Sequence, residues 1–440
     1  MEIVVKIVQL ILSLSILVIL HEFGHFLFAK IFKTRVEKFY LFFNPGFSLF
    51  RFRKGETEYG MGWLPLGGYV KISGMIDESM DKDQMKKPPQ PWEFRSKPAW
   101  QRLLIMLGGV TMNFILAILI YAAVLSVWGE QYLPVENVKY GISASPVAQE
   151  IGFQNGDKIV SVEGIEVKRF SDIPKTILLE KANTVTVERN GELQQVAIPD
   201  SLFPKLLDNP QFISFRVPAV VGGFSEQSPA KQAGIEPGDR IVSVNGEDVR
   251  FMDQLKEILV NKKGEEISVT VERDGTTKSF DLTTTSEGLI GFYVGNLNEY
   301  FQLEERRYNF AAAIPAGISK GVTTFKEYIQ QLGLIFTPET EAYKEVGGFI
   351  TIGKIFPGVW DWYAFWNLTA FLSIILAIIN VLPIPALDGG HVMFLFYEIL
   401  SGQRPSDKFL EYAQIAGMLI VLSLIIYANG NDIVKLFTNQ

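Results

Sequence analysis

The residues in this sequence that are best placed to do chemistry lie near the end of an N-terminal apolar run, Ile3 to Phe32, which contains His-Glu-Phe-Gly-His at positions 21–25. Residues four apart lie on one face of a helix, so His21 and His25 can direct ring nitrogens at one metal ion. Glu22 lies about a quarter-turn away on such a helix. This spacing therefore predicts two zinc ligands and a general base.

The apolar setting strengthens that prediction. The pattern H-E-x-x-H also recurs by chance in unrelated proteins. However, ionisable groups at membrane depth are costly unless they are paired, metal-bound or facing a wet cavity. Three such groups within five residues therefore need a common partner, and a zinc ion is the partner that we expect.

A third ligand is expected from a later segment, which reads N-V-L-P-I-P-A-L-D-G-G-H at positions 380–391. The two prolines should break the preceding apolar helix and place Asp388 on irregular backbone, on the same membrane side as the two histidines. Asp388 is thus the predicted third zinc ligand, although a turn residue is the alternative. We expect His391 to begin a helix or to support a ligand, because three protein ligands leave the open position that catalysis needs.

Composition places the chain among membrane proteins that carry soluble parts. It has 440 residues, 48% of them hydrophobic, and a net charge of -7, with a mean hydropathy of +0.18. The absence of cysteine excludes thiolate catalysis, cysteine-ligated zinc and disulfides. The N-terminal run is too long for a signal peptide and lacks an A-x-A site, so we expect it to be retained as an anchor. Nucleic acid is not an expected partner.

Charge distribution predicts the topology. Residues 33–100 contain twelve Lys or Arg against eight Asp or Glu and lie between two apolar runs, which favours a cytoplasmic location. Both termini should then be extracytoplasmic and the zinc site should lie toward the cytoplasm. An amphipathic helix at the interface is expected over Phe310 to Phe336. The four predicted spans are Ile3 to Phe32, Trp100 to Trp128, Trp362 to Val381 and Ala413 to Tyr427.

Residues Lys38 to Ile72 are rich in aromatic and branched side chains, with turn signals at 44–46 and 54–56, and they predict β-hairpins beside the first span. Gly67, Gly68 and Tyr69 lead into a strand-prone stretch that an extended peptide could approach closely, so they are candidate substrate contacts. A purely structural hairpin is the alternative.

The second span carries Gly108 and Gly109, expected to permit close helix packing, and Asn113, expected to face the bundle interior.

An internal repeat fills the region between the second and third spans. G-D-K-I-V-S-V-E-G at 156–164 matches G-D-R-I-V-S-V-N-G at 238–246, and V-T-V-E-R-N-G at 185–191 matches V-T-V-E-R-D-G at 269–275. The two copies resemble PDZ domains of the bacterial kind, which bind extended peptides by strand addition.

The predicted fold is a polytopic α-helical membrane protein with four transmembrane helices, a membrane-associated β-hairpin sheet and two tandem α+β PDZ-like domains. The predicted parts are 1–129 (first membrane part, with hairpins at 38–72), 130–215 and 216–300 (PDZ-like domains), 301–360 (amphipathic connector) and 361–440 (second membrane part).

Taken together, H-E-x-x-H, G-x-x-x-N (Gly109 to Asn113) and N-x-x-P-x-P-x-L-D-G-G resemble the motifs of site-2 proteases, and the PDZ-like pair resembles the bacterial regulator-of-sigma-E type. The resemblance implies a zinc intramembrane endopeptidase of the bacterial cytoplasmic (inner) membrane. Its expected substrates are single-span membrane proteins, namely anti-sigma factors and remnant signal peptides, cut in regulated intramembrane proteolysis with access gated by the PDZ-like domains. The resemblance also implies substrate contacts at Asn380 and Asn113 and a membrane-reentrant sheet. One departure is Phe-Phe-Asn-Pro at 42–45, where many relatives carry G-F-G-P.

Two other classes of function are alternatives. A non-enzymatic scaffold could bind peptides through the PDZ-like pair and hold a structural metal, but structural zinc usually takes four protein ligands. A metal transporter should carry further intramembrane ligands, and the sequence offers none.

Overall fold

The computed structural model describes residues 2–65, 67–75 and 88–438. The chain divides into two compact units. The charged linker expected over Asp77 to Pro98 falls largely on residues 76–87, which lie outside the described part. The first unit comprises Met1–Gly129, Arg307–Gly333 and Tyr343–Gln440, and the second comprises Glu130–Arg306 and Leu334–Ala342.

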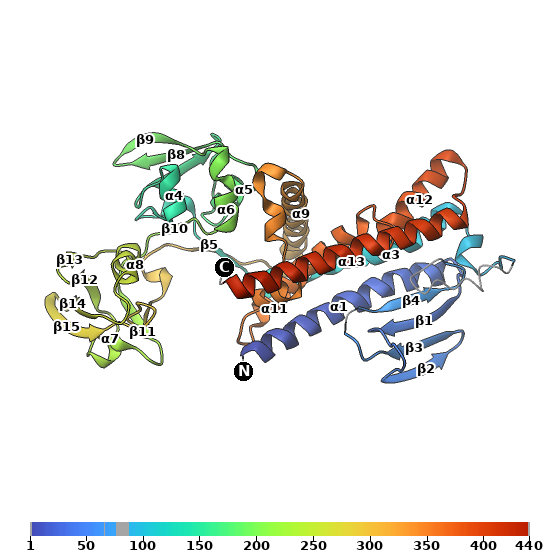
Figure 1. Ribbon diagram of the computed structural model, residues 1–440, viewed down its shortest axis with the longest axis horizontal. Helices are drawn as coiled ribbons and strands as arrows, with labels where there is room; N and C mark the ends of the chain where they lie inside the picture. The colour runs from blue at the N-terminus through green and yellow to red at the C-terminus, as the bar shows by residue number, and fades with distance from the viewer. Residues whose placement is uncertain (1, 66, 76–87, 439–440) are drawn as a thin grey trace. The chain divides into compact units, whose positions relative to one another are not determined.

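Among the described residues, four helices of the first unit are long and apolar enough to cross a membrane. A helix satisfies its own backbone hydrogen bonds, which is what a segment surrounded by lipid requires. The fourth helix begins before and ends after the predicted span because its polar ends continue the helical turns beyond the apolar stretch. The chain is thus a polytopic helical membrane protein. The four helices are α1 (Glu2–Ile31), α3 (Ala99–Trp128), α11 (Trp362–Val381) and α13 (Asp407–Thr438) (Figure 1).

Helix α3 is the central element of this unit, because it packs against α1, α11 and the shorter α12 (Asp388–Ser401). Helices α1 and α3 touch backbone to backbone where Gly24 meets Gly108. A Cβ atom built on Gly24 would lie 2.2 Å from the carbonyl oxygen of Gly108. Only residues without side chains permit this approach, so small residues set the contact between the helix that carries the histidines and its main neighbour.

A four-stranded sheet follows α1 and has the strand order β2-β3-β1-β4. Strands β2 and β3 form the hairpin expected at 54–56, but β1 lies parallel to β3. The hairpin expected at 44–46 was therefore wrong: the chain crosses over between β1 and β2, and β1 pairs with β3 and β4 instead. Strand β4 is left at the edge and lies against α1. The strands are β1 (Val36–Leu41), β2 (Phe50–Lys54), β3 (Thr57–Met61) and β4 (Tyr69–Ile72).

The second unit contains two segments that share a common set of elements and pairings. The first segment has an additional helix before its last strand, and the second has an additional two-residue strand that joins its ladder. In each, a first and a last short strand pair antiparallel, and three other strands form an antiparallel ladder. Each also buries an equivalent ion pair, Asp157 with Arg189 and Asp239 with Arg273. The first segment is β6 (Ile142–Ala144), α4 (Pro146–Ile151), β7 (Lys158–Val162), α5 (Asp172–Leu179), β8 (Thr184–Arg189), β9 (Glu192–Ala197), α6 (Phe203–Asp208) and β10 (Ile213–Phe215). The second is β11 (Val221–Phe224), α7 (Pro229–Gln232), β12 (Arg240–Val244), β13 (Glu247–Asp248), α8 (Met252–Val260), β14 (Glu266–Arg273), β15 (Thr276–Thr283) and β16 (Phe292–Val294).

The connector after the second segment returns to the first unit as helix α9 (Phe310–Ile335), which is not among the helices with the composition of a span. It contains Pro315 and packs its aromatic residues Phe325 and Tyr328 on a core shared with α3 and α11. The short helix α10 (Phe349–Ile355) receives its N-terminal cap from α13, because Asp432 accepts hydrogen bonds from the first backbone amides of α10.

Candidate metal centre and adjoining cavity

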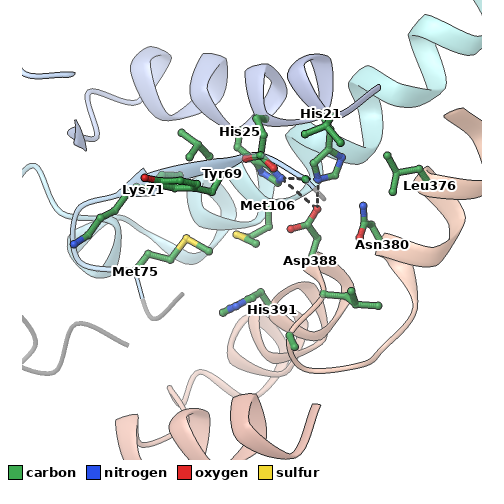
Figure 2. Close-up of a pocket in the computed structure, with 18 of the residues that line it drawn as sticks. His21, His25, Tyr69, Lys71, Met75, Met106, Leu376, Asn380, Asp388 and His391 are labelled. Carbon is green, nitrogen blue, oxygen red and sulfur yellow. Dashed lines mark hydrogen bonds and ion pairs between the residues drawn. The ribbon is translucent and has the colours of Figure 1, made fainter. Parts of the chain in front are cut away.

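Three side chains from two distant parts of the chain converge in the first unit. The Nε2 atoms of His21 and His25 each lie 3.2 Å from Oδ2 of Asp388 and 3.2 Å from one another. Figure 2 shows the three side chains pointing toward one another. Ligand atoms about 2.0–2.1 Å from a tetrahedral zinc ion lie about 3.3 Å apart. The triangle formed by these atoms therefore has the size that zinc requires. Apart from the two imidazoles, the buried Oδ2 atom has no hydrogen-bond partner among the described residues.

The opposite nitrogen of each imidazole is held by α3. Nδ1 of His25 lies 2.8 Å from the carbonyl oxygen of Ile105, so it must carry the proton and leave Nε2 free to ligate. Nδ1 of His21 lies 3.3 Å from the side-chain amide of Asn113, whose oxygen is buried and has no hydrogen-bond partner within the described ranges. Amide oxygen and nitrogen are placed by their hydrogen bonds. Turning the amide over brings that oxygen onto Nδ1–H of His21 and satisfies both groups.

Gly109 has a more specific role than the helix packing expected for it. A Cβ atom built there would lie 2.5 Å from Nε2 of His25 and 2.8 Å from Nε2 of His21. Any side chain at this position would occupy the space in which the two imidazoles meet. The bare backbone of α3 at Gly109 therefore forms one wall of the candidate metal centre.

Asp388 does not lie on irregular backbone as expected, because it is the first residue of α12. The break predicted from the two prolines is present, but it ends one residue earlier, with Leu387 as the N-cap. A carboxylate in the first turn of a helix is favoured by the exposed amides and the helix dipole. The loop before it contains Ala386 at a φ of 97°, a conformation that costs a non-glycine residue about 1–3 kcal/mol.

A cavity of about 650 Å³ adjoins the three candidate ligands. Glu22 lines it, and the backbone amide of Val70 in β4 donates a hydrogen bond to the Glu22 carboxylate. The edge strand thus touches the candidate general base directly. His391 also lines the cavity, but it is not part of the group of converging ligand atoms, as expected.

The candidate substrate contacts Gly67, Gly68 and Tyr69 all line this cavity. A Cβ atom on Gly68 would lie 2.7 Å from the carbonyl oxygen of Tyr40 and 2.9 Å from Val18, so a side chain there would push β4 away from α1. Burial raises the pKa of Tyr69 to about 12, and its hydroxyl therefore stays protonated.

The sequence at 42–45 that departs from the related motif supports this strand. Phe42 is held at a φ of 67°, in the region where a glycine would be unstrained. The side chain of Asn44 accepts a hydrogen bond from the Tyr69 hydroxyl at 3.0 Å and donates one to Ser48. Asn44 therefore helps to fix the position of β4.

The remaining candidate substrate contacts are placed differently. Asn380, near the end of α11, lines the cavity (Figure 2). Asn113 does not line it and lies fully buried behind His21. A lining residue that the sequence did not single out is Gln414 of α13. Its sequence context could have predicted it, because an isolated amide side chain within an apolar membrane helix marks a candidate functional residue.

The chain is similar to known proteins along nearly all of its length. Residues 9–424 match the model of peptidase family M50. The chain is 29% identical over 457 residues to the regulator of sigma-E protease RseP of Escherichia coli, covering 97% of this chain and 98% of the relative. It is 28% identical over 473 residues to protease RseP of Yersinia pestis, covering 99% and 100%. It is also 27% identical over 456 residues to a Treponema pallidum protein named "Putative zinc metalloprotease", covering 98% and 100%.

The match to the family model spans nearly the whole chain, including both segments that supply the converging ligand atoms. The relatives are named as proteases and zinc metalloproteases over the same length. This chain is therefore a membrane-embedded enzyme that belongs to peptidase family M50, the site-2 protease family.

Proposed function

We propose that this enzyme is a zinc-dependent intramembrane endopeptidase with His21, His25 and Asp388 as its ligands and Glu22 as its general base. The observation that carries the proposal is the convergence of two imidazole nitrogens and one carboxylate oxygen, each pair 3.2 Å apart, beside a cavity. Three protein ligands leave a fourth position open, as in catalytic zinc sites.

When bound, zinc supplies Lewis-acid polarisation and lowers the pKa of water at the site. Glu22 takes the proton from the attacking water and passes it to the leaving amine. The hydrogen bond from Val70 orients this carboxylate. The hydrogen bonds at Nδ1 of the two histidines keep both Nε2 lone pairs directed at the metal.

The substrate is a membrane-spanning segment that has been locally unwound. A helical peptide hides its carbonyl groups in its own hydrogen bonds, so the segment must open before attack. Strand β4 is at the edge of its sheet and borders the cavity, so it can pair with the opened peptide as an added strand. Helix-breaking residues near the cut should therefore favour cleavage. Because relatives are named regulators of sigma E, anti-sigma factors and remnant signal peptides are the proposed physiological substrates.

The proposed setting is the bacterial cytoplasmic membrane, with the metal centre toward the cytoplasm and both termini outside. The two repeated segments, at 130–215 and 216–300, are proposed to be PDZ-like domains that gate access. Folded domains of this size, about 25–30 Å across, can obstruct a bulky external domain and admit a trimmed substrate. The segment 301–360 is proposed to connect them along the interface to the second membrane part.

Incubation of the purified protein with a labelled single-span peptide tests the activity. Cleavage is expected without chelator, loss of cleavage with a zinc chelator, and recovery when zinc is added back. Cleavage that is unaffected by removal of zinc would contradict the proposal.

Two variants test the setting. Lys54→Cys should react only with thiol reagents that enter the cytoplasm, and Asn190→Cys should react with impermeant ones. Labelling of both from one side would refute the topology.

Deleting Glu136 to Thr285 with a flexible linker tests the gating role of the repeated segments. The deletion should retain cleavage of a short-tailed substrate and newly allow cleavage of one with a folded external domain. Loss of the first activity with zinc retained would show that the segments recruit substrate instead.

A further inference from the structure

Helix α13 brings one polar side chain into the catalytic cavity. The helix is otherwise largely exposed within the chain, as expected of a helix surrounded by lipid, but Gln414 and Gly417 are buried. These residues are three apart and therefore lie on one face. Gln414 is only 6% exposed and lines the cavity that Asp388 and Asn380 also line.

Gly417 holds this face against the loop that leads to Asp388. A Cβ atom built on Gly417 would lie 1.2 Å from the carbonyl oxygen of Pro385, so no residue with a side chain could bring α13 this close. Pro385 lies in the loop that separates α11 from α12. The contact therefore fixes Gln414, one turn earlier in α13, next to the wall that carries the third candidate ligand.

The amide of Gln414 makes no hydrogen bond to another residue in the part of the chain that the structure describes, and neither does that of Asn380. A polar side chain at membrane depth is costly unless it has a partner or faces a wet cavity. Such a residue persists in a membrane helix when a ligand or substrate completes its hydrogen bonds. Gln414 thus has donors and an acceptor available to whatever enters the cavity.

Strand β4, whose outer edge pairs with no other strand in the described part of the chain, also lines this cavity. A peptide that pairs with β4 through one edge leaves the N–H and C=O groups of its second edge unpaired. Within a membrane those groups must also be satisfied. A glutamine amide offers both a donor and an acceptor and so matches a peptide group. We propose that Gln414, together with Asn380, binds the backbone edge of the substrate that β4 leaves free. This inference rests on the proposed peptidase function. It assigns α13 a role in binding the extended substrate through backbone groups, independently of the substrate's side chains.

The test compares full-length Gln414→Met with the wild type, because methionine keeps the length of the side chain and removes the amide. Loss of a hydrogen bond that leaves a buried partner unsatisfied costs about 1–3 kcal/mol, or about 5- to 150-fold in affinity. We expect KM for a labelled single-span peptide to rise by a factor in this range with kcat and zinc content nearly unchanged. In a Glu22→Gln background, the affinity for the uncleaved peptide should fall by the same factor.

Gln9→Met is the matched control, because Gln9 is equally a buried glutamine of a membrane helix but bonds to Pro357 and does not line the cavity. Its KM should equal that of the wild type. Peptides with single amide-to-ester replacements near the cut identify the contact, since the ester that disrupts it should weaken binding in the wild type and not in Gln414→Met.

An unchanged KM and affinity in Gln414→Met would overturn the proposal, and loss of zinc would show that Gln414 acts on the metal centre instead. If Gln414→Met does not accumulate, Gln414→Ala is measured in the same way. A wild-type protein that neither binds nor cleaves any single-span peptide would instead refute the proposed function itself, so the two failures are distinguishable.

Discussion

Substitution of Gly109 by alanine should weaken zinc binding while leaving the membrane bundle assembled. The added Cβ atom would lie 2.5 Å from Nε2 of His25 and 2.6 Å from Cε1 of His21. Ordinary van der Waals contact needs about 3.5–4.0 Å, so each imidazole must move by about 1 Å. Zinc–ligand distances are maintained within about 0.2 Å, and the displacement therefore exceeds what the site can absorb.

The energetic consequence follows from overpacking, which costs about 1–3 kcal/mol in a well-packed interior. If this free energy opposes zinc binding in full, the zinc affinity falls by about 5- to 150-fold. Zinc affinity is measured by competition with a chromogenic chelator on purified Gly109→Ala, with thermal unfolding of the metal-free protein recorded on the same sample.

Gly430→Ala is the control, because this glycine also lies in a membrane helix and an added Cβ would meet nothing within 4 Å. Alanine should leave zinc affinity unchanged there and stabilise the helix by about 1 kcal/mol. The reasoning is refuted if Gly109→Ala binds zinc as tightly as the wild type, or if both variants lose zinc to the same extent.

Three further predictions concern other parts of the chain. Because Phe42 has a positive φ, Phe42→Gly should be more stable than Phe42→Ala by about 1 kcal/mol in thermal unfolding. Equal stability of the two variants would show that the backbone at this position is not strained. Asn113→Leu should weaken zinc binding by about 10- to 100-fold, whereas Asn113→Asp should bind zinc nearly as the wild type does, because only aspartate keeps an acceptor for Nδ1–H of His21. An equal loss of zinc affinity in both variants would refute this role of Asn113. Burial opposes the charged form of Asp239, but hydrogen bonds from Arg273 and a backbone amide lower its pKa overall. The pair therefore stabilises its segment above the unfolded Asp pKa of about 3.9 and this stabilisation is lost as pH falls through the lower folded pKa. Hydrogen exchange in β12 should show that loss in the wild type and not in Asp239→Asn.

The sequence predicted features that depend on local regularity. His21 and His25 face one way because any helix stacks residues four apart. The four spans follow from long apolar runs, which have few alternatives in a membrane. Asp388 could be linked to the histidines across more than 360 residues of chain only because the proline-broken helix and the membrane sidedness restricted where it could lie.

Features that depend on how elements meet could not be predicted in this way. The role of Gly109 arises from the point at which α1 crosses α3, and sequence spacing does not specify that point. The parallel pairing of β1 with β3 depends on a crossover whose turn signals are those of a hairpin. Gln414 lies in a helix that is apolar on all sides, so its hydrophobic pattern could not show which face is buried.

The most direct test of the central claim separates the base from the ligands. Glu22→Gln should retain zinc and lose cleavage of a single-span peptide, because it removes the proton acceptor and leaves His21, His25 and Asp388 in place. Asp388→Ala should lose both zinc and cleavage. Metal content and cleavage are measured on the same preparations. Cleavage by Glu22→Gln at near the wild-type rate, or full zinc content in Asp388→Ala, would contradict the proposed mechanism.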